Sequence, residues 1–437
     1  MLSPRIGWLL EHEFRQLLAA RPFWFLLLLI GPLVGQGFIA AVQAYSEASG
    51  IGGGPSALAQ GLSPLDGIFV PTFGAYDLAA TLLLPFVAIR LISSEKESGS
   101  WKLLLQAPVD LSVILMSKFL VLLAGWLMIW IPGLVAIMFW ASYGGSIYWP
   151  ELLNLLTGHF LRAILSIAVA FAAGAFAKNA ASAAILTLAF TVGAWALEFI
   201  AAGRGGWLEW FASYTPTAAL RSFELGLCQA GAIMVCLSLV VFGFALTRFW
   251  MLPLKHPLMH TAILAIGLAA LILVSAQIHS VWDVSENRRN SFPAADAEAL
   301  SRVGAPLRMT VRLAPEDPRR TDLDRNIVAK LRRTLPRLTV EYIAQSQAGM
   351  FEAQGSRYGE IWYEMDTRKQ MSRSTTEPIV LGVIYQVAQV TPPVSSDEKA
   401  YPGHPLAVRP AGAAWFYYLA WPCLIGFAFW SNFKGRK

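Results

Sequence analysis

Long apolar runs dominate the chain. A helix needs about 20 mainly apolar residues to cross a bilayer, because every backbone polar group must be bonded within the segment. Eight segments meet this requirement: 23–45, 72–92, 113–141, 155–177, 180–202, 228–250, 261–280 and 411–431. The pattern therefore predicts a mainly α-helical, polytopic membrane protein with eight spans.

Residues 1–22 have a different pattern, with apolar residues at helical spacing and charged residues on the other face. The apolar positions are Ile6, Leu9, Leu10, Phe14, Leu17 and Leu18. We expect an interfacial helix here, with a plain surface anchor and a specific docking role as equal alternatives. The first long apolar run begins only after Arg21 and follows acidic as well as basic residues. We therefore predict a retained span rather than a signal peptide.

One segment of the chain has the charge content of a water-soluble domain. Residues 283–410 contain 18 Lys and Arg and 16 Asp and Glu, which is about 27% charged, against about 9% elsewhere, where about 25% is usual for soluble proteins. Partial alternation predicts strands at 307–314, 338–345 and 360–366. Helices are expected at 377–390 and along a stripe of apolar residues at every fourth position, formed by Leu323, Ile327, Leu331 and Leu335. The order β-α-β-β-α favours a small α/β domain.

The distribution of basic residues predicts the orientation. With the N-terminus in the cytoplasm, the short outer segments 46–71 and 142–154 contain no Lys or Arg, whereas the inner segments and the C-terminal tail are rich in them. This is the positive-inside pattern. It places both termini in the cytoplasm and residues 283–410 outside. The net charge of +6 does not indicate nucleic-acid binding, because most of the unpaired basic residues lie beside spans.

Signals for catalysis or metal binding are weak. The three cysteines lie in apolar runs, and His256 and His260 have Pro257 between them and no carboxylate or cysteine nearby. No lysine follows a glycine, as a P-loop requires. We therefore expect no enzyme activity, no metal and no bound cofactor in this chain. A membrane-anchored enzyme is disfavoured by the lack of a catalytic constellation.

Two charged residues inside the predicted spans are candidate functional residues, because such charges are expensive in lipid. Arg162 is expected near the outer end of the fourth span and Glu198 near the outer end of the fifth, so we hypothesise an ion pair between them. A structural staple or snorkelling to the headgroups is the more common explanation. A secondary transporter is disfavoured, because we expect no acidic residue at the middle of the membrane.

The predicted cytoplasmic loop between the second and third spans carries the most specific motif. It places Glu95, Lys96, Glu97 and Gly99 before a leucine-rich turn that includes Leu104 and Leu105, then Ala107, Pro108 and Val109, and ends at Lys118. From the residues alone, a short amphipathic helix docked on a cytoplasmic partner and a loop lying on the headgroups are equally good interpretations.

The loop resembles the signature of type-2 ABC exporter permeases. Ser100 stands where that family usually has threonine. The resemblance implies that the loop is a coupling helix bound by a separate ABC ATPase subunit, which holds ATP and Mg. It also implies a bacterial inner-membrane location and pairing with a second permease copy or homologue.

Two further segments resemble parts of such permeases. Residues 203–227, with the turn at 213–216, are similar to the family's outer half-helices, although an aromatic membrane-interface belt also accounts for their Trp and Tyr residues. The segment from Asp283, with Arg289, Ser291 and Phe292, loosely resembles the start of the auxiliary domain of gliding-motility (Gld-type) permeases. An extracytoplasmic auxiliary protein is therefore a further partner that the resemblance suggests.

The resulting architecture is a six-span permease core with two extra spans flanking an α/β domain. The expected boundaries are 1–22 for the interfacial helix, 23–252 for the core with the coupling loop at 93–112, 253–282 for span seven, 283–410 for the domain, and 411–437 for span eight and a basic tail. The predicted function is ATP-driven export. The alternative is an ATP-driven complex that remodels the envelope through the outer domain without moving a solute.

Overall fold

The chain forms two compact units. The computed structural model describes residues 4–50, 61–104, 106, 109–201, 206–252, 257–278, 280–314, 317–335, 337–343, 357–393 and 401–434. The first unit, here called the membrane unit, comprises Met1–Ala196, Tyr214–Ser280 and Pro402–Lys437, and the second, the α/β unit, comprises Leu197–Ser213 and Val281–Tyr401. The expected domain boundary at 410 therefore moves to 401, since the following residues pack with the membrane unit.

The membrane unit is helical, and the described residues contain eight helical segments long and apolar enough to cross a membrane, as predicted. Its helices in chain order are α1 (Pro4–Ala19), α2 (Arg21–Gly50), η1 (Leu65–Phe69), α3 (Val70–Glu97), α4 (Ser100–Leu104), α5 (Leu111–Ser142), α6 (Trp149–Phe176), α7 (Ala180–Ala201), α9 (Pro216–Glu224), α10 (Ala230–Met251), α11 (Pro257–Ala276), α16 (Ala413–Trp415), η4 (Phe416–Ala420) and α17 (Trp421–Lys434). The last residues of α7, from Leu197, fall in the α/β unit, as does α8 (Gly206–Ala212).

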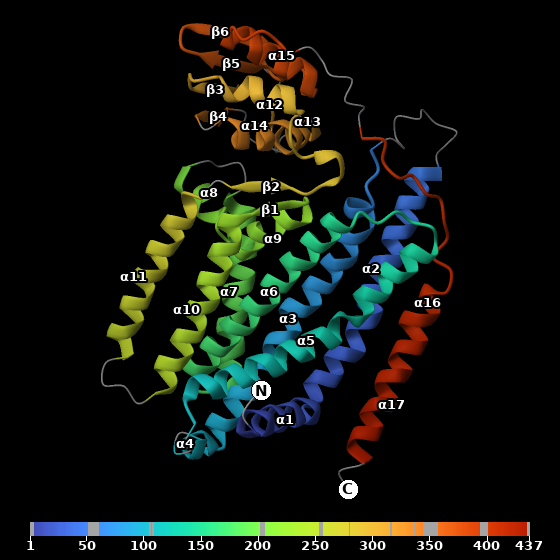
Figure 1. Cartoon of the computed structure of the whole chain (residues 1–437), viewed down its shortest axis with the longest axis vertical. Helices are drawn as coiled ribbons and strands as arrows, with labels where there is room; N and C mark the ends of the chain where they lie inside the picture. Colours follow the sequence, from blue (N-terminus) through green and yellow to red (C-terminus); the bar gives the residue numbers. More distant parts are fainter. Residues whose placement is uncertain are drawn as a thin grey trace, which may run out of the picture. The chain divides into compact units, whose positions relative to one another are not determined.

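The inner part of the membrane unit is built from α2, α3, α5 and α6, with α10 packed on α6. Large aromatic side chains fill it, among them Phe38, Phe73, Trp126 and Trp140, all almost completely buried. Both chain ends lie at the end of the bundle that carries α1 and α4, here called the α4 end (Figure 1). This is the arrangement expected of an even number of spans.

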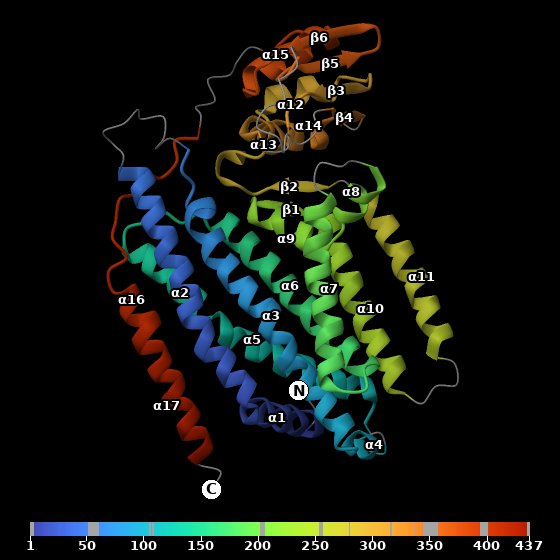
Figure 2. The ribbon, with the colours of Figure 1, turned by 180° about the vertical axis from the view of Figure 1, so that it is seen from behind.

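The seventh and eighth spans do not pair with each other. Helix α11 packs against α10, whereas η4 and α17 pack against α2, on the other side of the bundle (Figure 2). The contact with α2 is close, because a Cβ at Gly31 would lie 2.0 Å from the ring of Trp421. The Trp421 indole also donates to the carbonyl of Leu27 at 2.7 Å. The eighth span is thus part of the packed bundle, rather than only a return path for the chain.

The segment that leads into the eighth span is also fixed on the membrane unit. The Tyr45 hydroxyl donates to the carbonyl of His404 at 2.7 Å, and the Ser46 hydroxyl donates to that of Val408 at 2.6 Å. Tyr45 and Ser46 belong to the last turns of α2, which explains why residues 402–410 group with the membrane unit and not with the α/β unit.

The α/β unit contains a four-stranded sheet in the order β4-β3-β5-β6, with β3 and β4 parallel and the other pairs antiparallel. Its elements are β2 (Val281–Asp283), η2 (Glu286–Arg288), α12 (Ala294–Ser301), β3 (Leu307–Val311), α13 (Pro318–Leu323), η3 (Asp324–Val328), α14 (Ala329–Thr334), β4 (Leu338–Tyr342), β5 (Ile361–Met365), β6 (Arg368–Ser372) and α15 (Glu377–Ala388). The core joins one face of the sheet to these helices. All four residues of the predicted helical stripe, from Leu323 to Leu335, are buried in it.

Strand β6 was missing from the sequence-based prediction. Its residues, Arg-Lys-Gln-Met-Ser, lack the β-branched and aromatic residues that mark strands. It forms because a tight turn with Asp366 at positive φ returns the chain beside β5, where Tyr363 faces Gln370. The three predicted strands are present but shorter than expected, and residues 344–345 of the second lie outside the described part of the chain.

Asp317 caps helix α13, and the stability that it contributes is expected to depend on pH. Its carboxylate accepts from the backbone N–H of Arg319 at 2.9 Å, from the Arg319 guanidinium at 2.8 Å and from the Tyr358 hydroxyl at 2.8 Å. These bonds, those of Arg319 first, lower the pKa of Asp317 to about 2.

Replacing Asp317 by alanine is expected to destabilise the α/β unit by about 1 kcal/mol at neutral pH, as for loss of a helix cap. Because the folded-state pKa is depressed, the contribution is present above the unfolded value of about 4 and is lost as the pH falls toward 2. Hydrogen exchange of residues 307–335, measured by mass spectrometry on the whole protein at several pH values, tests this. An equal difference between wild type and variant at pH 6 and at pH 2 would contradict it.

Candidate functional site

The loop after α3 is connected to the rest of the α4 end through a buried cluster of charges. Lys118, near the start of α5, is fully buried and donates to both carboxylate oxygens of Glu13, at 2.8 and 2.9 Å. It also donates to Glu95, at the end of α3, at 2.6 Å. Glu13 lies on α1 and is 1% exposed. One ammonium group therefore joins α1, the end of α3 and α5.

The next two residues, Lys96 and Glu97, end α3 and form hydrogen bonds to the turn between α6 and α7. The Lys96 ammonium donates to the carbonyls of Ala175 and Ala177, at 2.7 and 2.6 Å, where α6 ends. The Glu97 carboxylate accepts from the backbone N–H of Ala180, at 3.1 Å, where α7 begins. A cation at a helix C-terminus and an anion at a helix N-terminus both complement the helix dipoles. Glu95, Lys96 and Glu97 thus contact different elements of the bundle.

The rest of the loop forms the short helix α4. Gly99 precedes it with a φ of +72°, a conformation that favours glycine, and nothing lies within 4 Å of where its Cβ would be. Trp101 is buried, and its indole donates to the carbonyl of Met251, at the end of α10, at 3.4 Å. Leu103 is 69% exposed. The predicted short amphipathic helix is therefore present, with one apolar side chain facing outward.

The sequence-based site residues of this loop are placed as follows. Glu95, Lys96, Glu97 and Gly99 lie together at the α4 end, and Leu104 is the last residue of α4. Pro108, with Leu105 and Ala107, lies outside the described residues.

Sequence reasoning missed Glu13 as a member of this site. A signal was present, because Glu13 is four residues after Leu9 and four before Leu17, which puts a carboxylate on the apolar stripe of α1. An acidic residue at such a position needs a buried partner. The apolar stripe of α1 does not show which basic residue is the partner of Glu13.

A second group of charges lies within the spans. The Arg162 Nε of α6 is 3.8 Å from the Asp77 Oδ1 of α3, and the His159 Nδ1 is 4.0 Å from the same oxygen. The Thr81 hydroxyl donates to this oxygen at 3.4 Å. His159 is 1% exposed and its ring lies tilted beside that of Phe73, at 5.3 Å between ring centroids.

The positions of these charges along their helices differ from what the sequence suggested. Helix α6 begins at Trp149, six residues before the expected start of the span, so Arg162 is the fourteenth of its 28 residues and lies at mid-helix rather than near one end. Asp77 lies beside it and is an acidic residue well inside a span. The expectation of no acidic residue at the middle of the membrane overlooked Asp77, which is the thirteenth residue of the 33-residue helical segment Leu65–Glu97.

The hypothesis of an Arg162–Glu198 ion pair stays a prediction. Glu198 is at the end of α7, in the part of that helix that groups with the α/β unit, whereas Arg162 belongs to the membrane unit. The carboxylate that the described residues place beside Arg162 is that of Asp77.

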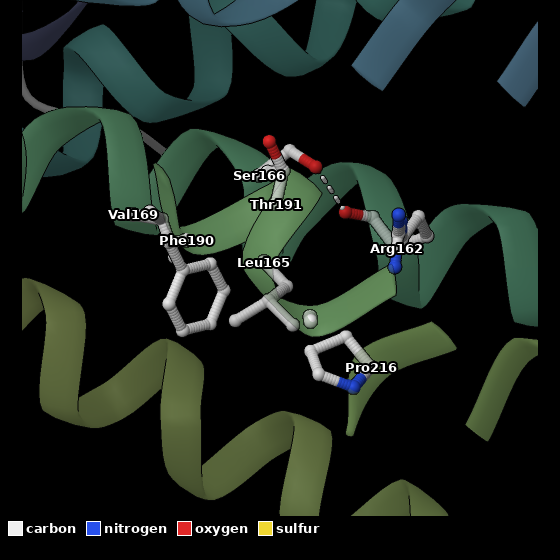
Figure 3. Close-up of a pocket in the computed structure, with 8 residues that line it drawn as sticks. Arg162, Leu165, Ser166, Val169, Phe190, Thr191 and Pro216 are labelled. Carbon is white, nitrogen blue, oxygen red and sulfur yellow. Dashed lines mark hydrogen bonds between the residues drawn. The ribbon is translucent and has the colours of Figure 1, made fainter. Parts of the chain in front are cut away.

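A small pocket lies next to Arg162, between α6, α7 and the start of α9. Its lining residues are Arg162, Leu165, Ser166, Val169, Phe190, Thr191, Ala194 and Pro216. Figure 3 shows Leu165 between Phe190 and Pro216, with the Ser166 hydroxyl bonded to the carbonyl of Arg162 at 2.9 Å. The Thr191 hydroxyl donates to the carbonyl of Thr187 at 3.1 Å. Both lining hydroxyl groups are thus engaged within their own helices.

The segment expected to form half-helices contains the short helices α8 and α9. Helix α9 begins with Pro216 and is capped by Thr215, whose hydroxyl accepts from the N–H of Ala218 at 3.2 Å. It packs on α6, where a Cβ at Gly158 would lie 2.6 Å from Phe223. Pro216 therefore begins α9, and Gly226, with a φ of +73°, follows its end. Both residues have structural roles in this segment.

Among the described residues, no group of three or more His, Cys, Asp or Glu could hold a metal ion. His260 stacks on Phe249 of α10, with 5.4 Å between ring centroids, and His256 lies outside the described residues.

Comparison with known proteins gives one match. Residues 7–201 match the family model described as an ABC-2 family transporter protein. No curated protein and no solved structure matches the chain. The match covers α1 to α7, including the loop around Glu95 and both charge clusters. Residues 7–201, a little under half of the 437-residue chain, are therefore similar to an ABC-2 family transporter protein.

Proposed function

We propose that this chain is the permease subunit of an ATP-driven exporter, in which hydrolysis by the separate ATPase moves the loop around Glu95–Pro108 and thereby the spans. The observation that carries the proposal is that residues 95–101 are bonded to α5, α10 and the α6–α7 turn, and through Lys118 of α5 to α1. A displacement of this loop reaches each of these elements through bonds of 2.6–3.4 Å. The exposed Leu103 is the apolar contact that we assign to the ATPase surface.

The proposal includes an assembly and an orientation. Two permease chains, identical or homologous, pair in the bacterial inner membrane and bind two ATPase subunits, which hold ATP and Mg. Both termini and the α4 end face the cytoplasm, and residues 281–401 lie outside. The common location of α1, α4 and the two chain ends supports this orientation, because the basic residues that flank the spans concentrate there.

The α/β unit supports a second function. It has its own core, and the eighth span, which follows it in the chain, packs on α2. The second function is that of a complex that transmits force from ATP hydrolysis to the envelope, in the manner of gliding-type permeases. In such a complex the force would pass through the α/β unit to an extracytoplasmic auxiliary protein. Deleting residues 283–400 separates the two functions, since export that persists after the deletion favours a plain exporter.

The coupling proposal is tested by replacing Leu103 with serine in the permease co-expressed with its ATPase. We expect at least a tenfold loss of ATPase recovered with the purified permease, because the apolar contact on α4 is lost. Trp8→Ser is the matched control: Trp8 is 67% exposed at the same end of the bundle, but lies on α1. Retention of the ATPase by Leu103→Ser, or equal loss in both variants, would contradict the role of α4.

A further inference from the structure

We propose that α3 and α6 adopt two arrangements in the membrane unit, and that the contacts of Asp77 distinguish them. In the arrangement that the structure shows, the Asp77 carboxylate lies near His159 and Arg162 but accepts no hydrogen bond from either. In the other arrangement it accepts a short hydrogen bond from each. The proposal deepens the proposed function, on which it rests for the force that drives the change, because it names a contact inside the membrane unit that alternates during transport.

The contacts of Asp77 are long. Its Oδ1 is 3.8 Å from the Nε of Arg162 and 4.0 Å from the Nδ1 of His159, and the hydrogen bond that it accepts from the Thr81 hydroxyl measures 3.4 Å. The hydrogen bond from Arg162 to the Thr217 hydroxyl is also 3.4 Å long. By comparison, the hydrogen bonds of the buried charges at the α4 end measure 2.6–2.9 Å. The charges within the spans are therefore close together but not closely bonded, although charges at such depth are costly and usually functional.

Buried polar atoms without a partner are concentrated around Asp77. Of eleven such side-chain atoms in the described part of the chain, six are on three neighbouring spans: the hydroxyl of Tyr76 on α3, the indole nitrogens of Trp126 and Trp130 on α5, and both ring nitrogens of His159 and the Nε of Arg162 on α6. The ring of Phe73 lies 5.3 Å from that of His159 and 6.2 Å from that of Trp130. Folded proteins leave few buried polar atoms unpaired, because each one costs free energy. A second arrangement in which these atoms form hydrogen bonds explains why they are kept.

Helices α3 and α6 are joined more firmly at the α4 end than in the middle. Lys96, near the end of α3, donates to two carbonyls at the end of α6, at 2.7 and 2.6 Å. Asp77 is 19 positions earlier on α3, which is about 29 Å at 1.5 Å per residue. Pro85 lies between them and has no N–H, so it cannot donate to the carbonyl of Thr81 and it weakens the helix there. A push on the loop after α3 can therefore bend this helix at Pro85 and change the distance from Asp77 to α6.

The proposal is tested first by replacing His159 with phenylalanine. The new ring can lie beside Phe73 as the imidazole does, but it has no polar atom. The substitution removes two unpaired nitrogens from the arrangement that the structure shows, so the apparent melting temperature of the purified chain in detergent is expected to rise by at least about 2 °C. It also removes a hydrogen bond to Asp77 from the other arrangement. ATPase turnover of the co-purified complex is therefore expected to fall at least about fivefold, with unchanged recovery of the ATPase.

Three further variants make the test specific. Tyr76→Phe deletes one unpaired oxygen without changing the ring and is expected to shift both quantities in the same directions, which keeps the test valid if His159→Phe packs poorly. His159→Asn keeps a donor near the position of Nδ1 and is expected to retain more turnover than His159→Phe. His260→Phe is the matched control, because this histidine stacks on Phe249 away from the three spans, and it is expected to leave melting temperature and turnover unchanged.

A melting temperature that falls or stays the same in both His159→Phe and Tyr76→Phe would overturn the proposal, since it would show that these atoms are satisfied in the arrangement that the structure shows. Turnover equal to wild type in both variants would also overturn it. A failure of the proposed function gives a different result. In that case no ATPase is recovered with the wild-type chain, whereas the melting temperatures, which need no ATPase, still decide whether the unpaired atoms destabilise this arrangement.

Discussion

Replacing Lys118 by methionine is expected to destabilise the membrane unit by about 3–5 kcal/mol, because breaking a buried ion pair leaves uncompensated charge. Lys118 is completely buried, and its ammonium is the partner of Glu13 and of one oxygen of Glu95. The other oxygen of Glu95 has no hydrogen-bond partner among the described residues. Without the lysine, two carboxyl groups would remain close together in an apolar environment.

Thermal unfolding of the purified protein in detergent measures the effect. Arg15→Met is the control, since the Arg15–Glu11 pair lies on the same helix α1 but is exposed, and its loss is expected to change stability by less than about 1 kcal/mol. The triple variant Glu13→Gln, Glu95→Gln and Lys118→Met removes all three charges and is expected to recover most of the stability. A Lys118→Met protein as stable as wild type would show that the cluster is unimportant for the fold.

The same triple variant separates stability from coupling. We expect it to fold but to transmit less of the loop's movement to α1 and α5, because neutral side chains form weaker bonds than charged ones. ATPase activity of the co-purified complex, compared between wild type and this variant, is the measurement.

Replacing Gly31 by valine is expected to displace the eighth span from α2. A Cβ at this position would lie 2.0 Å from Cδ1 and 2.5 Å from Nε1 of Trp421, so the indole cannot keep its bond to the carbonyl of Leu27. Overpacking of this kind costs about 1–3 kcal/mol, and about 1 kcal/mol more follows from the lost hydrogen bond. We expect proteolysis of the segment 402–412 to become faster, because the displaced span no longer anchors the end of the segment and leaves it held by its other bonds, such as those to Tyr45 and Ser46 of α2.

Gly74→Val is the control for this experiment. Gly74 also lies in a span, α3, but no atom lies within 4 Å of where its Cβ would be. The comparison holds the type of substitution constant and changes only the contact. Equal rates of proteolysis in wild type and Gly31→Val would mean that the eighth span does not need this close approach.

The sequence predicted local features well because they depend on neighbours along the chain. The eight spans follow from the length of the apolar runs, and the buried stripe from Leu323 to Leu335 follows from its spacing. The loop with Glu95, Lys96 and Glu97 stood out by its motif. Strand β6 was missed because its polar residues carry no local signal, and the sheet forms there through the turn at Asp366.

The partners of the charged residues could not be obtained in the same way. Lys118 and Glu13 are 105 positions apart, and Arg162 and Asp77 are 85 apart by their numbering. Helical periodicity gives the face on which a residue lies, but not which helix packs on that face. For Arg162 this led to Glu198 being chosen as partner from the short α6–α7 turn, while Asp77 on α3 went unnoticed.

By itself, therefore, the sequence determined that this protein has eight helices long and apolar enough to cross a membrane and one charged α/β unit, because chain length, charge and local periodicity are sufficient for those statements. The tertiary structure alone decided that Lys118 joins α1 to the loop, that Arg162 lies at mid-helix beside Asp77, and that the eighth span packs on α2. These depend on close packing between distant segments, where the absence of one side chain at Gly31 decides which helices can meet.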